Sequence, residues 1–176
     1  MNLLTNDNPL VLWQETIKTA EERCDVKLNH ELESYLISLL NDYTNKPEIT
    51  RQIFAMSLLN AHQAEDQIRH HSFQQVGDHC LIYAGLFPQA ANKKLVKISY
   101  FVDMGRSAYI SISNGTNDLF KLLSLQFVIL MDVLQCIRPH PGLLPIEAFE
   151  QWSEVGSQRA FRILTEYAQH RGLPKF

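Results

Sequence analysis

A stretch of nineteen residues, Leu119 to Ile137, constrains the fold more than any other part of the chain. Apolar side chains cover most of its helical circumference. Four of its polar residues fall on one narrow stripe at 100° per residue: Lys121, Ser124, Asp132 and Gln135; Gln126 lies off that stripe. Two charges within such a stretch are costly in a bilayer, so the pattern favours a buried helix over a membrane span. We therefore predict that a helix over 116–137 is the most buried element, with the following side chains almost inaccessible: Leu125, Phe127, Val128 and Leu134.

Helix start signals are easy to find in the first half of the chain. Asn8 before Pro9 predicts an N-cap with proline at the first helical position, and Asn29 predicts a second N-cap. Pro47 predicts the start of a third helix. The polar run 62–71 is either a hinge or the solvated start of a fourth helix. That helix continues through Phe73 and is expected to end before Gly85, which would take the left-handed position just beyond it.

The segment 95–113 is ambiguous from its pattern alone. Alternating apolar and polar residues over 96–103 and 110–113 are typical of strands, so a hairpin turning near Gly105 is the alternative. A helical interpretation places Phe101, Gly105 and Ala108 on one face. We favour the helix, because its surroundings are helical and an isolated two-strand hairpin is marginally stable.

The second half of the chain continues the helical pattern. The run 114–117 breaks it before the central helix, and Pro145 opens a helix that carries Phe149 and Trp152. Gly156 kinks that helix or separates it from a last one. The sequence thus predicts an all-α fold: one domain over 1–176, with seven or eight helices packed as a bundle around the central helix.

Composition excludes several classes of protein. The 176 residues carry 16 Lys and Arg against 19 Asp and Glu, a net charge of -3, which argues against nucleic-acid binding. The cysteines Cys24, Cys80 and Cys136 form no CxxC pair, and we expect three buried, reduced thiols. The N-terminus lacks the basic start of a signal peptide, so the expected location is the cytoplasm.

One metal site is conceivable, although the expectation is a protein without metal or cofactor. The sequence lacks the Glu-x-x-His motif of di-iron bundles. His62, Asp66 and His70 follow one another at four-residue spacing, which can present three ligands on one helix face. The competing interpretation is a solvated helix start.

Small residues indicate a close helix crossing with polar neighbours. Gly77 and Gly105 each lie inside a predicted helix, where glycine costs about 1 kcal/mol relative to alanine, and each is followed by a charged residue. We predict that the two helices meet there and that Asp78 pairs with Arg106. The candidate site for an anionic or polar ligand comprises Asp78, Tyr83, Tyr100, Asp103, Arg106 and Tyr109.

Several segments resemble a family of uncharacterised bacterial all-helical proteins. They are Glu31-Leu-Glu-Ser-Tyr-Leu36, Gly77-Asp-His-Cys-Leu81, Ala84-Gly-Leu-Phe-Pro88, and Tyr100-Phe-Val-Asp-Met-Gly-Arg-Ser-Ala-Tyr109. They comprise 26 of the 176 residues. The resemblance implies a bacterial, cytoplasmic protein and transfers no site residues.

Two functions therefore stay open. The first is a non-catalytic interaction or regulatory module that binds a protein partner or a second copy of the chain. The second is a helical protein that binds or converts a small molecule at Asp78 and Arg106, so whether the chain is an enzyme is left open. An exposed apolar patch near 138–145 or Trp152 would favour the first. A pocket that joins Asp78, Arg106 and Tyr109 would favour the second.

Overall fold

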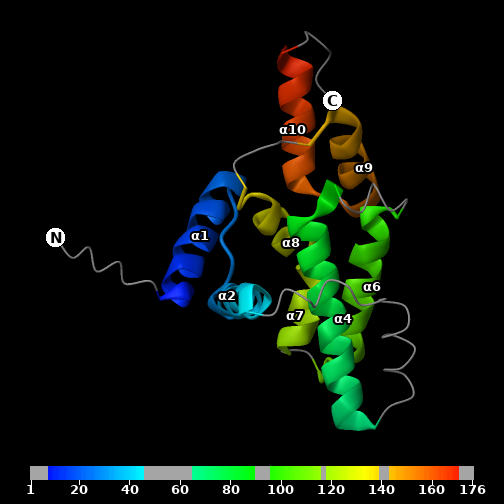
Figure 1. The fold of residues 1–176 in the computed structure, drawn as a ribbon. Coiled ribbons are helices and arrows are strands. Elements are labelled where there is room, and N and C mark those ends of the chain that lie inside the picture. Colours follow the sequence, from blue (N-terminus) through cyan, green and yellow to red (C-terminus); the bar gives the residue numbers. More distant parts are fainter. Residues whose placement is uncertain (1–7, 46–64, 90–95, 116–117, 139–142, 171–176) are drawn as a thin grey trace, which may run out of the picture.

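The computed structural model describes residues 8–45, 65–89, 96–115, 118–138 and 143–170 (Figure 1). This part of the chain is all-helical, as the sequence predicts. Its helices are, in chain order, α1 (Pro9–Cys24), α2 (His30–Asn45), α4 (Asp66–Leu86), α6 (Ile98–Ser111), α7 (Leu119–Leu125), α8 (Phe127–Gln135), α9 (Pro145–Val155) and α10 (Gln158–His170). The predicted helix that begins at Pro47 lies outside the described residues.

Short polar side chains begin the first two helices where the sequence predicts. Asn8 Oδ1 accepts a hydrogen bond from the N–H of Leu10 at 3.1 Å. Asn29 Oδ1 accepts one from the N–H of Leu32 at 2.9 Å. Each cap satisfies an N–H group that the first helical turn leaves unpaired. At the other end of the chain, Gly156 adopts φ 75° and separates α9 from α10.

The segment 98–111 is the helix α6, which confirms the helical interpretation over the hairpin. α6 packs closely along α4, as the two internal glycines predict. A Cβ at Gly77 would lie 2.5 Å from Cε1 of Tyr109, and one at Gly105 would overlap the ring of Phe127. The glycines therefore make room for aromatic side chains of neighbouring helices.

The centre of the bundle is shared by α8 and the second half of α4. Residues 79–85 of α4 are all buried, and α8 buries Phe127 and Leu134 completely, as predicted. Gly85 is part of α4 and not the left-handed residue after it, so that prediction is wrong. The side chain of Leu134 fills the space beside Gly85, where a Cβ would lie 2.5 Å from the leucine Cβ.

The predicted central helix over 116–137 is two shorter helices with a turn at Gln126 between them. Val128 is half-buried, and Leu125, the last residue of α7, is 62% exposed, so the prediction for Leu125 is wrong. The turn interrupts the helical register, so the apolar face of α7 does not continue that of α8. Within the described ranges, we find no helix with the length and apolarity needed to cross a membrane.

The helices α9 and α10 lie side by side at one end of the bundle, beyond the last turn of α4 and the first turn of α6 (Figure 1). They form a hairpin with a small core of its own. Leu143, Ala148 and Ala160 are buried there, and Trp152 and Leu164 pack against them while staying half-buried. Most of the large apolar side chains of the hairpin therefore keep exposed surface.

Candidate functional site

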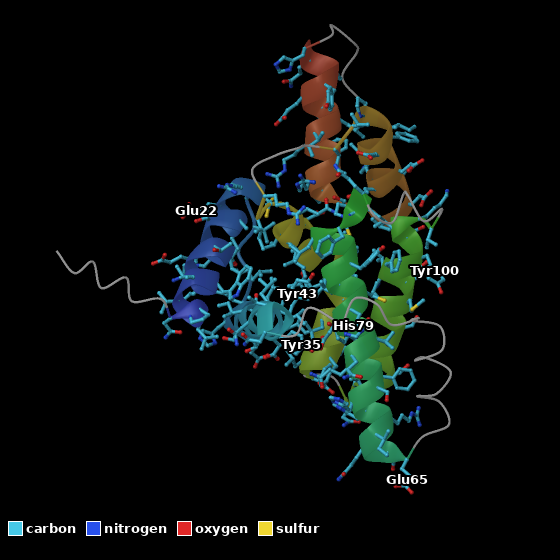
Figure 2. The ribbon with its side chains drawn as sticks, viewed as in Figure 1. Glu22, Tyr35, Tyr43, Glu65, His79 and Tyr100 are labelled. Atoms are coloured by element: carbon cyan, nitrogen blue, oxygen red, sulfur yellow. The ribbon has the colours of Figure 1, made fainter. Side chains whose placement is uncertain are left out.

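The carboxylate of Asp78 is held by two tyrosines from different helices. The hydroxyl of Tyr35 on α2 donates to Asp78 Oδ1 at 2.6 Å, and that of Tyr109 on α6 donates to the same atom at 2.7 Å. The amide of Gln74 donates to the Tyr35 hydroxyl at 3.2 Å. Figure 2 shows Tyr35 lying between α2 and α4. The arrangement joins α2, α4 and α6 through one oxygen atom.

Burial raises the pKa of the Asp78 carboxyl group and of the tyrosines bound to it. The residue Asp78 keeps some exposed surface, but its carboxylate lies on the enclosed side. Desolvation raises the pKa of Asp78 to about 7, although the hydrogen bonds from Tyr35 and Tyr109 act to lower it. Burial and the nearby Asp78 charge also raise the pKa of both tyrosines, which stay protonated as donors.

The predicted ion pair between Asp78 and Arg106 is wrong. Arg106 is exposed on α6, and Tyr109, three residues further along the same helix, reaches the carboxylate instead. The reason is the space beside Gly77, which admits the aromatic ring of Tyr109 and places its hydroxyl at Asp78. Arg106 takes part in packing through its backbone, because its carbonyl oxygen accepts from Ser124 Oγ at 3.0 Å.

The other predicted ligand-binding residues lie apart from Asp78. Tyr83 is buried and packs on Phe101, with ring centroids 4.6 Å apart. Tyr100 is 47% exposed and lies on the outer side of α6 (Figure 2). Asp103 is also exposed. Of the six candidates, the structure brings together only Asp78 and Tyr109.

The hypothetical metal ligands are only partly described. Asp66 is the exposed first residue of α4, and His70 is half-buried with its ring edge-on to Phe120 at a centroid distance of 5.1 Å. His62 lies outside the described residues. Among the side chains that the structure places, no three His, Cys, Asp or Glu residues gather as metal ligands.

A second buried carboxylate, Asp132 on α8, fixes the α9–α10 hairpin to the bundle. Its Oδ1 accepts from the hydroxyl of Ser157 at 2.6 Å, and its Oδ2 accepts from the N–H of Arg159 at 3.3 Å. The guanidinium of Arg159 donates to Gln135 Oε1 at 2.8 Å. Desolvation raises the pKa of Asp132, and the hydrogen bond from Ser157 opposes this shift. Asp132 and Gln135, two residues of the polar stripe predicted from the sequence, thus accept the hydrogen bonds that attach the hairpin to the bundle.

Exposed apolar side chains lie on α9 and at the residue that precedes it. Ile146 is 63% exposed, Leu144 is 58% exposed and Phe149 is 50% exposed. The ring of Trp152 continues them, with centroid distances of 6.1 Å to Phe149 and 5.3 Å to Phe161 of α10. We call Leu144, Ile146, Phe149 and Trp152 the α9 surface. It is the exposed apolar patch near residue 145 and Trp152 that would favour an interaction module.

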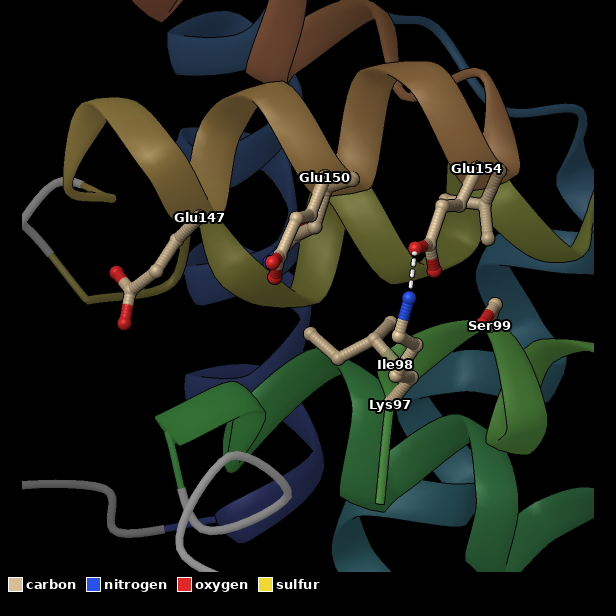
Figure 3. Close-up of a pocket in the computed structure, with 8 residues that line it drawn as sticks. Lys97, Ile98, Ser99, Glu147, Glu150 and Glu154 are labelled. Atoms are coloured by element: carbon tan, nitrogen blue, oxygen red, sulfur yellow. Dashed lines mark hydrogen bonds and ion pairs between the residues drawn. The ribbon is translucent and has the colours of Figure 1, made fainter. Parts of the chain in front are cut away.

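Glutamates border the α9 surface on the side away from α10. Glu147, Glu150 and Glu154 follow one another along α9 (Figure 3). Glu154 Oε1 binds Nζ of Lys97 at 2.6 Å and ties α9 to the start of α6. The small hollow between the two helices measures about 10 Å³, enough for roughly one water molecule and too small for an organic ligand.

Sequence reasoning missed the residues that complete both carboxylate sites. Tyr35, Ser157 and Arg159 come from helices distant in the chain, and no local motif marks them. Leu144 and Ile146 were also missed, although their place around Pro145, at the start of an amphipathic helix, was a usable signal. Comparisons of the chain with protein families, with curated proteins and with solved structures find no match.

Proposed function

We propose that this protein is a non-catalytic interaction module that binds an amphipathic, basic helix of a partner protein on the α9 surface. The observation that carries the proposal is the exposure of Ile146 and Phe149, three residues apart on α9, with exposed Leu144 just before the helix. Fully burying an apolar side chain of this size contributes about 1.5–3 kcal/mol, so leaving three exposed gives up a large favourable term. A partner that covers them recovers that term.

The shape of the α9 surface suits a helix lying along it. Ile146, Phe149 and Trp152 are spaced three residues apart, so they form a ridge along one side of α9. α10 lies along one edge of this ridge, where Trp152 contacts Phe161. A helix with apolar residues at three- and four-residue spacing can pack against such a ridge.

The acidic charge beside the α9 surface favours a partner with basic residues. Helices α9 and α10 together carry four glutamates and two arginines. Arg159 donates to Gln135 and Arg162 to the carbonyl oxygen of Cys24, so both arginines are directed towards the bundle. In a dimer of this chain, the glutamates beside the two α9 surfaces would repel each other. A partner helix with Lys or Arg flanking its apolar stripe would instead attract them.

The test uses two synthetic helical peptides that differ only in charge. One has leucines on one face and lysines beside them, and the other has glutamates in place of the lysines. Binding is followed by the fluorescence of Trp152 in a Trp13→Phe background and by calorimetry. We expect the basic peptide alone to bind. The double change Ile146→Ser and Phe149→Ser should weaken binding at least about ten-fold, because such central apolar contacts usually carry most of the affinity.

Matched controls separate docking from general charge attraction. Leu125→Ser removes an equally exposed leucine on α7, and Glu15→Gln with Glu22→Gln removes acidic charge from the exposed face of α1. Both should leave binding unchanged, whereas Glu147→Gln with Glu150→Gln should weaken it. Equal losses for all variants, or no binding of the basic peptide to the wild-type chain, would refute the proposal. A dimer that Phe149→Ser dissociates would replace the partner by a second copy.

A further inference from the structure

Two of the three cysteines meet where α1, α8 and α10 come together. Cys24 is the last residue of α1 and Cys136 follows the last residue of α8. Their thiols lie close enough to affect each other's ionisation, although 112 positions separate them in the chain. The third thiol, Cys80, lies apart in the bundle core beside Gly105.

Arginines from two helices hold the backbone around this pair. The guanidinium of Arg23 donates to the carbonyl oxygen of Cys136 at 3.1 Å and to that of Ile137 at 3.2 Å. From α10, Arg162 donates to the carbonyl oxygen of Cys24. These contacts lock the ends of α1 and α8 against each other. The two sulfur atoms are thus kept adjacent by the tertiary structure and not by a local motif.

The two thiols have different environments. Cys136 is 7% exposed and Cys24 is 1% exposed. The adjacent Cys24 thiol lowers the pKa of Cys136, and the positive charge of Arg159 adds to this effect. The pKa of Cys24 is raised by the adjacent Cys136 thiol and by burial. Cys136 is therefore the nucleophile that an incoming reagent meets first, and Cys24 stands behind it as the resolving thiol.

We propose that Cys24 and Cys136 form a redox-active dithiol, which a low-molecular-weight disulfide such as oxidised glutathione converts into an intramolecular disulfide bond. The Cys136 thiolate attacks the glutathione disulfide, forms a mixed disulfide and releases one glutathione thiolate. Cys24 then attacks the Cys136 sulfur and releases the second glutathione, which takes up the Cys24 proton. The protein loses two electrons and two protons, and one glutathione disulfide becomes two thiols.

The first experiment uses the wild-type protein. The native, reduced protein is incubated with oxidised glutathione at neutral pH, quenched with acid and alkylated, and its peptides are analysed by mass spectrometry without reduction. We expect a crosslinked peptide that contains Cys24 and Cys136, while Cys80 is recovered as an alkylated thiol. Circular dichroism before and after the reaction verifies that the chain stays folded.

Two variants distinguish the roles of the thiols. In Cys24→Ala the mixed disulfide with glutathione should persist at Cys136, and in Cys136→Ala the remaining thiols should resist the reagent in the folded state. Cys80→Ala is the matched control and should form the crosslink normally. A wild-type protein that keeps its thiols until it is denatured, that stops at the mixed disulfide, or that crosslinks through Cys80 would overturn the proposal. The readout does not involve the α9 surface, so it is independent of partner binding.

Discussion

The bundle encloses large apolar side chains, whereas the α9–α10 hairpin encloses mainly alanines. Phe127, Leu130 and Leu134 are completely buried at the centre of the bundle. In the hairpin the completely buried apolar positions are Ala148 and Ala160, and the larger side chains around them keep part of their surface exposed. Since apolar burial is the main favourable term in folding, the hairpin has less of it to stabilise its own structure.

Two buried carboxylates of the bundle make different connections. Asp78 joins three helices of the bundle through hydroxyl groups of Tyr35 and Tyr109. Asp132 accepts hydrogen bonds from the hydroxyl of Ser157 and the N–H of Arg159, both at the start of α10. The hairpin thus depends on a polar attachment at its base, and we expect it to open locally before the bundle unfolds.

The largest expected effect comes from the same substitution made in both regions. Phe127→Ala should lower the free energy of unfolding by about 3–5 kcal/mol, because it leaves a cavity against α4 and α6. Phe149→Ala removes a half-exposed ring from α9 and should change it by less than about 1 kcal/mol. Urea denaturation measures both. Similar losses for the two variants would show that the hairpin is as tightly packed as the bundle.

A smaller effect should show that the α9–α10 hairpin opens separately from the bundle. Asp132→Ala leaves the buried hydroxyl of Ser157 and the N–H of Arg159 without their acceptor, at a cost of about 1–3 kcal/mol. Amide hydrogen exchange should accelerate in α10 and stay slow in the second half of α4. Asp103→Ala, at an exposed position of α6, is the control and should change neither. Uniform acceleration across all helices would show that the hairpin does not open separately.

The last prediction concerns the pH dependence of stability. An aspartate in the unfolded chain ionises near pH 4, whereas folded Asp78 holds its proton up to about pH 7. The unfolded state therefore loses this proton first as the pH rises, so Asp78 makes stability fall between those values and adds no further loss above them. Asp78→Asn should remove this fall, which we expect to exceed about 1 kcal/mol.

The measurement is the difference between the wild type and Asp78→Asn across this pH range, because other groups titrate there. Asp132 has a raised pKa and contributes with the same sign as Asp78. Burial lowers the pKa of His79 to about 4, so its contribution has the opposite sign, and stability is lost as the pH falls from 6.5. Parallel pH curves for the two proteins would show that Asp78 is not held protonated by the bundle.

Local signals in the sequence predicted most of the described fold. Asn8 and Asn29 cap helices because the capping hydrogen bond spans only two or three residues, and Gly156 breaks a helix because its conformation suits glycine. These local signals failed where contacts between helices determine the backbone conformation. Gly85 was predicted to end a helix, but α4 continues through it because Leu134 packs into the space that glycine leaves.

The candidate site could be predicted less well. Asp78 was identified from its place beside Gly77, but its partner was chosen by charge. Arg106 and Tyr109 are one turn apart on α6, and the setting of that helix against α4 decides which one reaches the carboxylate. Tyr35 arrives from α2, so no spacing within α4 or α6 could reveal it. The amphipathic pattern of α9 indicated a helix, but not that Phe149 faces outward.

The contact between Arg23 and the end of α8 has a consequence for the order in which the chain folds. The bond from Arg23 to the carbonyl oxygen of Cys136 spans 113 positions of sequence. At a translation rate of about 5–20 residues per second, α1 is made at least roughly five seconds before the end of α8, on which it packs. α2, which also packs on α1, follows it directly in the chain, but the face of α1 that packs on α8 lacks its partner throughout that interval. Nascent α1 is therefore a segment that a chaperone can recognise during synthesis.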